Sequence, residues 1–522
     1  MDSAHSILRS ARHFFAGTFL SRISGMARDI AMAFCFGSAP EIAAFMVAYR
    51  LANLFRRLFG EGNLQAGFVP HFESVRSENL QSACLFYRDT VFSMGVVLLG
   101  LVGLIEMILF AACHWVGDDW RGIIELSMWM VPGLFFICLY ALNSSLLLCQ
   151  KKNFLPAVAP VFFNFVWIGA VFLVWELPRE EAAKWLSLSV TGAFAAQWIA
   201  TAFAERRLMR EHVGLKEWFR PHLFSNECKA LLKPLSLGIV GIGAVQFNSA
   251  LDAIFARLAD PSGPSFLWFA IRVQQLPLAL FGIALSGALL PPLARAMRQE
   301  NRLLYRQLLQ SSLRHSAALM LFCTFGIISL GGVGINLLYG HGDFSPMDVN
   351  ETLLCLWGYG IGLVPSVFVL LLAGGFYAQK NYRIPTIASL SSVGANVVLN
   401  AFFVFGFGWG AVSIAIATSA SAFLNAAILG IGLKKQIGEI FGIGFWRFFL
   451  KMSLACALPA AAASQIGHFW MGGSFPRSFS LQILQCACLT AVYMAGVAFI
   501  AWRFQFLEFL GFLRTKKLVD SQ

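Results

Sequence analysis

Apolar runs of about 20 residues, the length that a helix needs to cross the hydrocarbon core of a bilayer, recur along this whole sequence. Short polar stretches separate them, and only 13% of the residues are charged, against about 25% in soluble domains. The pattern predicts an all-α polytopic membrane protein with about 14 transmembrane helices and no large soluble domain. We expect these helices near residues 14–36, 42–60, 90–113, 123–148, 154–175, 186–204, 234–257, 265–291, 315–339, 352–378, 385–405, 410–432, 448–466 and 480–502.

The same sequence argues against a cleaved leader and against zinc sites. Arg22, Arg28 and Asp29 interrupt the first apolar run, which the core of a cleaved secretory leader would not tolerate, so we expect no leader. The 11 cysteines lie mostly inside apolar runs, without a CxxC pair and without a nearby His to complete a zinc set. They are therefore predicted to pack as small buried side chains rather than to bind zinc.

Basic residues collect in every second connection between the expected helices. Positively charged short loops stay on the cytoplasmic side of a membrane, so this alternation predicts that both termini are cytoplasmic. The longest of the basic loops is expected from Glu205 to Lys233. The net charge of +12 then reflects topology and contacts with anionic membrane lipids rather than nucleic-acid binding.

An internal repeat links two parts of the chain at an offset of 222 residues, the separation of Arg50 and Arg272. Residues 45–72 align with residues 267–294, and a matched arginine inside an apolar span is unusual. Each copy is expected to hold an even number of helices, so both enter the membrane in the same sense and an axis along the membrane normal relates them. The sequence therefore predicts an N-terminal lobe over residues 1–222, a C-terminal lobe over 223–440, and two extra helices with a cytoplasmic tail over 441–522.

The first two expected helices carry charges that are costly inside a membrane. A charge at mid-bilayer costs about 2.5–3.5 kcal/mol on insertion scales, so such residues usually face a cavity or a partner. Guanidinium groups suit phosphate, because their planar fork donates paired hydrogen bonds and stays protonated. Positive charge exceeds negative charge in this set, which predicts an anion-binding cavity lined by Arg22, Arg28, Asp29, Arg50, Arg56, Arg57 and Glu61.

A structural role for these charges is the alternative. Arg28 could form an ion pair with Asp29 inside the protein. Arg57 could do the same with Glu61, one helical turn away, while the other arginines of the second helix reach the membrane interface. The second copy of the repeat has apolar residues where the first has Arg56, Arg57 and Glu61, so the first lobe carries charge that its duplicate lacks.

At these residues the sequence resembles the MurJ (MviN) family of bacterial lipid II flippases, within the multidrug/oligosaccharidyl-lipid/polysaccharide exporter superfamily. The most specific matching segments are SRISGMARD at 21–29 and RLANLFRRLFGEGNLQAGFVP at 50–70. Weaker matches extend the resemblance over nearly the whole chain, at residues 269–293, 337–345, 374–385 and 415–425.

The resemblance implies a transporter rather than an enzyme, in the bacterial cytoplasmic (inner) membrane. Such a flippase turns lipid II, an undecaprenyl-pyrophosphate-linked disaccharide-pentapeptide, from the cytoplasmic to the periplasmic leaflet for cell-wall synthesis, by alternating access of two lobes. The two extra helices would hold the lipid tail, and we expect a monomer. The residues that match the family's essential cavity arginines and their acidic partners are Arg22, Arg28, Arg56, Arg57 and Arg272, with Asp29 and Glu61.

Two positions depart from the family pattern, since Ala43 and Ile271 stand where many members have Asp. Some members also bind sodium in the second lobe. The candidate oxygen ligands here are Asp252, Asn396 and Asn400. A hydrogen-bonded polar cluster that packs helices together is the alternative for these residues, and the coupling ion, sodium or a proton, is left open.

Other functions remain as alternatives. A flippase for another polyprenyl-linked glycan, or a drug/cation antiporter, would share this architecture, but a cation exporter should line its cavity with acids and aromatic residues. A membrane glycosyl- or phosphotransferase would need a loop with paired carboxylates, a metal set or an activated nucleophile. The longest expected loop offers no such pattern.

Overall fold

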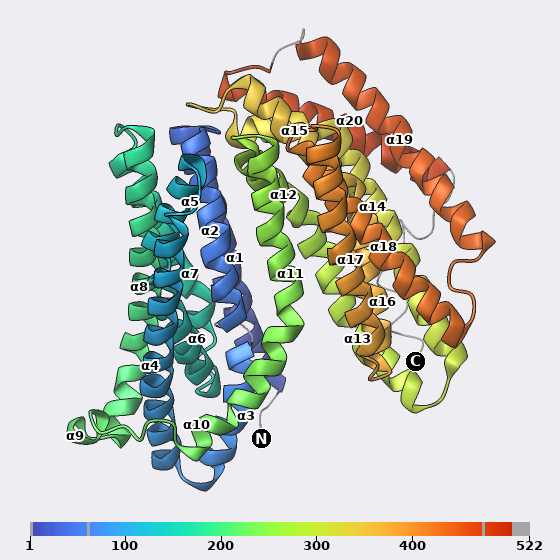
Figure 1. Cartoon of the computed structure of the whole chain (residues 1–522). Coiled ribbons are helices and arrows are strands. Elements are labelled where there is room, and N and C mark those ends of the chain that lie inside the picture. The colour runs from blue at the N-terminus through green and yellow to red at the C-terminus, as the bar shows by residue number, and fades with distance from the viewer. Residues whose placement is uncertain (1–3, 60–62, 472–474, 504–522) are drawn as a thin grey trace. The chain divides into compact units, whose positions relative to one another are not determined.

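The computed structural model describes residues 4–59, 63–471 and 475–503 (Figure 1). Within these residues it consists of helices and their connections, with no β-strand, so the predicted all-α class is confirmed. Contacts divide the chain into two compact units, Met1–Ile254 and Phe255–Gln522. The division falls within one helix, and the lobe boundaries predicted after residues 222 and 440 stay predictions.

The first unit is a bundle of long helices in which α1 and α7 pack side by side, and α8 packs against both α6 and α7. Gly37 ends α1 by adopting a φ of +56°, in the left-handed region that favours glycine. Pro40 then begins α2, where its fixed φ suits the first helical position. The helices are α1 (Ala4–Phe36), α2 (Pro40–Phe59), α3 (Asn63–Glu78), α4 (Leu80–Ala112), α5 (Asp118–Met130), α6 (Gly133–Cys149), α7 (Phe154–Val174), α8 (Arg179–His212), α9 (Leu215–Trp218), α10 (Asn226–Ala230) and α11 (Leu232–Ala259), which leads into the second unit.

The second unit is also a helix bundle. Ser345 caps one of its helices, because its Oγ accepts from the Asp348 backbone nitrogen while the Asp348 carboxylate accepts from the Ser345 nitrogen. The last two helices, α19 and α20, pack on α14 and on each other, and Figure 1 draws them along one side of this unit. The elements are α12 (Gly263–Pro277), the π-helical η1 (Leu278–Ile283), α13 (Ala284–Arg298), α14 (Arg302–Tyr339), α15 (Pro346–Ile361), α16 (Leu363–Ala378), α17 (Arg383–Ala401), the π-helical η2 (Phe402–Gly406), α18 (Val412–Ile437), α19 (Ile443–Met471) and α20 (Phe479–Arg503).

The helices have the length and composition of membrane spans. Among the described residues, 10 helices are long and apolar enough to cross a bilayer, or 11 if the bent pair α5 and α6 is one span. Three other expected spans coincide with α1, α2 and α11. Large apolar side chains such as Leu99, Met107 and Phe110 of α4 are exposed, as a surface that faces lipid requires. The chain is a multi-pass membrane protein, and the count of 14 spans stays a prediction.

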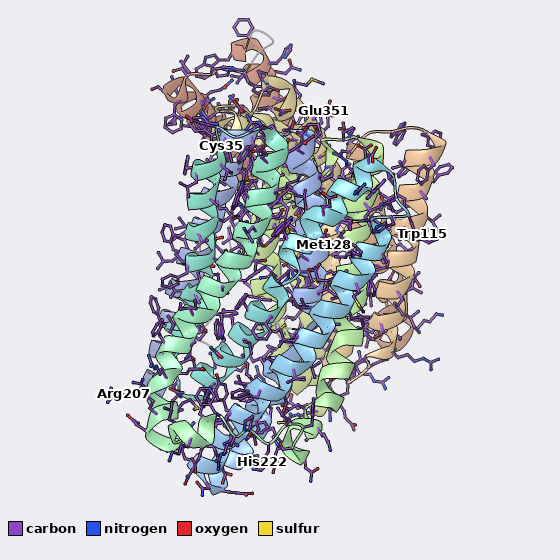
Figure 2. All side chains as sticks on the ribbon, turned by 60° about the vertical axis from the view of Figure 1, so that its left-hand side comes forward. Cys35, Trp115, Met128, Arg207, His222 and Glu351 are labelled. Atoms are coloured by element: carbon purple, nitrogen blue, oxygen red, sulfur yellow. The ribbon has the colours of Figure 1, made fainter. Side chains whose placement is uncertain are left out.

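One predicted boundary is wrong. The basic loop was expected to begin at Glu205, but α8 continues to His212, and Glu205 is only 8% exposed inside the first unit. Hydropathy placed the end of the span where polar residues begin, although a helix can continue beyond the apolar core as long as its hydrogen bonds are made. Figure 2 shows Arg207 and His222 near one end of the first unit and Cys35 and Trp115 near the other.

Candidate functional site

Arg28 and Asp29 form a buried ion pair on α1. Arg28 Nη2 lies 2.8 Å from Asp29 Oδ1, and Arg28 Nε lies 3.1 Å from the same oxygen. The two side chains are 7% and 4% exposed. The ion pair that the structural alternative expected between these residues is therefore present, and it neutralises one of the predicted cavity arginines.

Helix α7 supplies further contacts of Arg28. Arg28 Nη1 donates to Asn164 Oδ1 at 3.2 Å, and the guanidinium carbon lies 4.5 Å from the ring centroid of Trp167. Asn164 Nδ2 in turn donates to Ser24 Oγ at 2.8 Å. Asn164 and Trp167 share a face of α7 because they are at positions i and i+3 of the helix. A carboxylate, an amide and an aromatic face thus hold this guanidinium in one position.

The arginines at the end of α2 flank an apolar face. Leu54 and Leu58, one helical turn apart, pack with Ala250 of α11. Arg56 is half-buried and Arg57 is exposed. The leucines of α2 therefore pack on α11, whereas Arg56 lines a pocket together with residues of α5, α6 and α8.

The remaining predicted residues of this unit are less enclosed than the ion pair. Arg50 is half-buried on α2, and Arg22 is exposed on α1. Glu61, and with it the alternative ion pair at the end of α2, lies outside the described residues. The structure joins Arg28 to Asp29 directly, and a cavity shared by the whole set stays a prediction.

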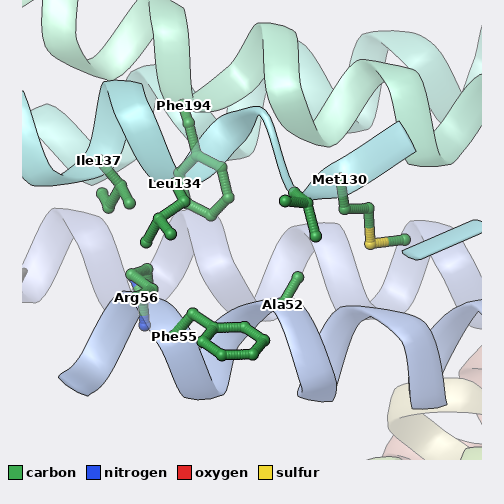
Figure 3. A pocket seen from close by; sticks show the side chains of 8 residues that line it. Ala52, Phe55, Arg56, Met130, Leu134, Ile137 and Phe194 are labelled. Atoms are coloured by element: carbon green, nitrogen blue, oxygen red, sulfur yellow. The ribbon is translucent and has the colours of Figure 1, made fainter. Parts of the chain in front are cut away.

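A small pocket adjoins Arg56 within the first unit (Figure 3). The pocket holds about 250 Å³ of free space, which includes space open to the surroundings. Arg56 is the one charged residue in its lining, which consists of Ala52, Phe55, Arg56, Met130, Val131, Leu134, Ile137 and Phe194. A pyrophosphate needs several donors, so this pocket alone does not provide the predicted anion site.

In the second unit, Arg272 lies on α12. Its guanidinium carbon is 4.5 Å from the ring centroid of Trp268, one helical turn earlier, which gives a cation–π contact. The positions that the repeat aligns with Arg56, Arg57 and Glu61 all fall in η1. The segment that carries charge in the first copy is therefore a π-helical, apolar segment in the second, and π-helical turns often occur at functional sites.

Comparison with known proteins decides the family. The family model described as lipid II flippase MurJ matches residues 32–484. The chain belongs to the MurJ family. The probable lipid II flippase MurJ of Chlamydia muridarum is 33% identical over 402 residues, which cover 76% of this chain and 73% of that protein. The lipid II flippase MurJ of Burkholderia cenocepacia is 27% identical over 513 residues, 95% of this chain and 96% of that protein.

Solved structures give the same fold for this MurJ family member. A lipid II flippase MurJ in an inward closed conformation superposes with a TM-score of 0.72 at 22% identity, covering 94% of this chain and 99% of that one. An inward-facing multidrug resistance MATE family transporter of the MOP superfamily superposes with a TM-score of 0.63 at 13% identity, covering 83% and 95%. The relatives are named as flippases, so the MurJ family assignment makes the chain a transporter rather than an enzyme.

The sodium candidates of this MurJ family member are engaged with protein groups. In the second unit, Asn400 Nδ2 donates to Asn396 Oδ1 at 2.9 Å, and Asn396 Nδ2 donates to Thr418 Oγ1 at 3.4 Å. The second bond links α17 to α18, as the polar-packing alternative expects. Asp252, on the first unit's part of α11, accepts from Asn248 Nδ2 at 3.3 Å. Sodium binding stays a prediction for this MurJ chain.

The sequence analysis missed a second buried ion pair, between Arg88 and Asp89 on α4. Arg88 Nη2 lies 2.6 Å from Asp89 Oδ1, and the side chains are 4% and 9% exposed. Arg88 Nη1 donates to the Glu217 carbonyl oxygen at 2.7 Å, and Asp89 Oδ1 accepts from the His222 nitrogen at 3.0 Å. The expected span began at residue 90, so this pair was treated as part of a loop. The available signal was the Arg-Asp dipeptide itself, which also occurs at residues 28 and 29 of this MurJ sequence.

Proposed function

We propose that this chain flips lipid II from the cytoplasmic to the periplasmic leaflet of the bacterial inner membrane, by alternating access of its two lobes. The family assignment and the name of the relatives, lipid II flippase, support this substrate. The central cavity would be lined by the arginines of α1 and α2 together with Arg272, with cytoplasmic termini and a monomeric chain.

The observation that carries this proposal is the way in which α1 and α7 hold Arg28. Burying a guanidinium among apolar helices is unfavourable unless its charge and donors are satisfied. Here Asp29, Asn164 and Trp167 do so, which fixes the group at one position. A guanidinium fixed in this way, on a helix next to a second one rich in arginine, suits a pyrophosphate, because paired hydrogen-bond donors and positive charge match its oxygens.

The C-terminal pair of helices offers a surface for the lipid tail. Leu450, Leu454 and Leu458 are exposed and recur at every fourth residue, so they form an apolar stripe on α19. We assign the long prenyl chain to this stripe. The coupling ion of the transport cycle would be sodium or a proton, with no other cofactor.

A leaflet-sidedness assay of lipid II in cells tests this function. A strain depleted of its own flippase would express this chain, and accessibility of lipid II from outside the membrane would be measured together with growth. We expect rescue by the unmodified chain and none by Arg28→Ala or Arg57→Ala, although both proteins are inserted. Arg57→Lys should also fail if bidentate gripping of phosphate is required.

Arg207→Ala is the matched control, because Arg207 is an exposed arginine of α8 paired with Glu211. It should rescue fully. Normal growth and outward lipid II with Arg28→Ala would contradict the arginine cavity. Failure of the inserted, unmodified chain to move lipid II would instead favour another polyprenyl-linked glycan as the substrate.

A further inference from the structure

Four polar side chains form a hydrogen-bonded series inside the first unit. Tyr87 comes from α4, Asn143 from α6, and Thr201 and Glu205 from α8. All four are buried, and Tyr87 belongs to a cluster of apolar side chains contributed mainly by α3, α4, α6 and the end of α8. None of the four belongs to the arginine set, so the proposed transport site does not account for them.

The hydroxyl group of Tyr87 has one hydrogen but two oxygen neighbours. Its oxygen lies 2.8 Å from Asn143 Oδ1 and within hydrogen-bond distance of Glu205 Oε2. The amide oxygen of Asn143 can only accept, since the Nδ2 group is turned to Thr201 Oγ1 at 3.4 Å. The hydrogen of Tyr87 therefore points to Asn143. The contact between Tyr87 and Glu205 then needs a hydrogen from the carboxyl group.

We infer that Glu205 is a proton-binding site of the first lobe, and that its carboxylic acid donates to the oxygen of Tyr87. Donation then runs in one direction through the whole series. Tyr87 donates to Asn143, and Asn143 donates to Thr201. The hydroxyl group of Thr201 donates to the carbonyl oxygen of Trp198 at 2.8 Å. Every hydroxyl hydrogen is used once, which a buried polar network requires.

The charged groups around this carboxyl group decide whether it can be held as an anion. In the part of the chain that the structure describes, no Lys, Arg or His nitrogen lies within ion-pair distance of Glu205. Helix α7, which packs along α8, has no ionisable residue, and α2 and α5 meet α8 near Phe194 and Thr191, three turns before Glu205. The ionisable residues that α3, α4, α6 and α10 contribute around the apolar cluster are Tyr87, the thiols Cys84, Cys149 and Cys228, His71, and the ion pairs Arg76–Glu73 and Arg88–Asp89.

The opposite direction of donation satisfies fewer groups. If the amide of Asn143 were turned over, its nitrogen could donate to Tyr87, and Tyr87 could donate to an ionised Glu205. The hydroxyl of Thr201 would then have to donate to the amide oxygen, and the carbonyl of Trp198 would lose the hydrogen bond from Thr201 and keep only that of the helix backbone. A buried anion without a cation would remain, which is strongly unfavourable.

Infrared spectroscopy of the purified full chain in lipid nanodiscs, at neutral pH, tests the inference. A protonated carboxyl group absorbs in a region separate from that of a carboxylate. The difference spectrum between the unmodified chain and Glu205→Gln should contain a carboxylic acid band that moves on exchange into D₂O. Other acids of the chain, such as Glu106, cancel in this difference.

Glu211→Gln on the same helix is the matched control, because Glu211 is exposed and paired with Arg207 at 3.1 Å. Its difference spectrum should contain only a carboxylate band. Tyr87→Phe provides a second test that does not depend on the folding of the Gln variant. It removes the acceptor but not the acid, so the Glu205 band should shift and persist.

A carboxylate band instead of an acid band in the Glu205→Gln difference would overturn the inference and favour the opposite direction of donation. An acid band whose position is unchanged in Tyr87→Phe would overturn the assigned hydrogen bond. These spectra do not involve lipid II, so their outcome is independent of the flipping assay.

Discussion

Helices α1 and α4 each contain an Arg-Asp dipeptide that closes on itself, with the arginine Nε and Nη2 both directed at one carboxylate oxygen. What differs is the third contact. Arg28 Nη1 reaches a side chain, Asn164 on α7, whereas Arg88 Nη1 reaches a backbone carbonyl in the segment after α8. The same local ion pair therefore ties two helices together in one place and anchors a connection in the other.

The comparison shows that burial alone does not identify a transport residue. Both pairs are buried to a similar extent, and replacing a buried ion pair by apolar side chains is often neutral for stability, whereas removing one partner is costly. The pair on α1 is bonded to a side chain of a second helix and shares its helix with Arg22, which is what the proposed pyrophosphate site needs.

The largest expected difference is in transport. Replacing the first pair by apolar residues, Arg28→Met with Asp29→Leu, should abolish lipid II flipping while the protein remains folded. The guanidinium group is lost, but no buried charge is left unpaired. Arg88→Met with Asp89→Leu should leave flipping intact. Growth of the depleted strain and lipid II accessibility measure both. Rescue by the first double variant, or loss of flipping in the second, would show that the two ion pairs do not differ in transport as proposed.

The next effect is on stability. Arg88→Ala leaves Asp89 buried without its cation and should lower the free energy of unfolding by about 3–5 kcal/mol. Thermal unfolding of the protein in detergent, with the double apolar variant as the reference, measures this loss. A single variant as stable as the double variant would show that Asp89 finds another partner.

A smaller effect is expected at the partner of the first pair. Asn164→Leu removes the amide oxygen that accepts from Arg28, and hydrogen bonds to charged groups contribute about 1.5–3 kcal/mol. The loss should appear in the same unfolding measurement. Combining Asn164→Leu with Arg28→Met should give less than the sum of the two losses, since both remove one interaction. Additive losses would mean that the two side chains are not coupled.

The smallest effect is expected at an exposed pair. Arg207 and Glu211 lie 3.1 Å apart on α8, but their side chains are 89% and 54% exposed. Exposed pairs at this spacing contribute about 0.3–0.5 kcal/mol and are screened by salt. Arg207→Ala should therefore unfold almost as the unmodified chain does. A loss comparable to that of Arg88→Ala would remove the distinction between buried and exposed pairs.

The sequence was sufficient for the class of fold and for the charged helices, because both depend on composition and on the cost of charge in a bilayer. It predicted a cavity role for Arg28, which stays a prediction, and left the ion pair with Asp29 as an alternative. It could not identify Asn164 or Trp167 as partners, since 136 residues separate Asn164 from Arg28 and helix packing brings them together. The buried position of Arg88 was not predicted, because a hydropathy window places helix ends where polar residues start. Glu205 was assigned to a loop for the same reason.

The π-helical segment η1 changes what the repeat can mean for the second unit. A π-helical turn accommodates about one more residue than a regular turn, and each residue of an α-helix advances the direction of the side chains by about 100°. The alignment between the copies continues through η1 without a gap, into α13. The side chains of α13 therefore point in directions that differ from those in an uninterrupted α-helix. Aligned residues of the two copies can then face different neighbouring helices, so the duplication does not by itself preserve the orientation of a helix.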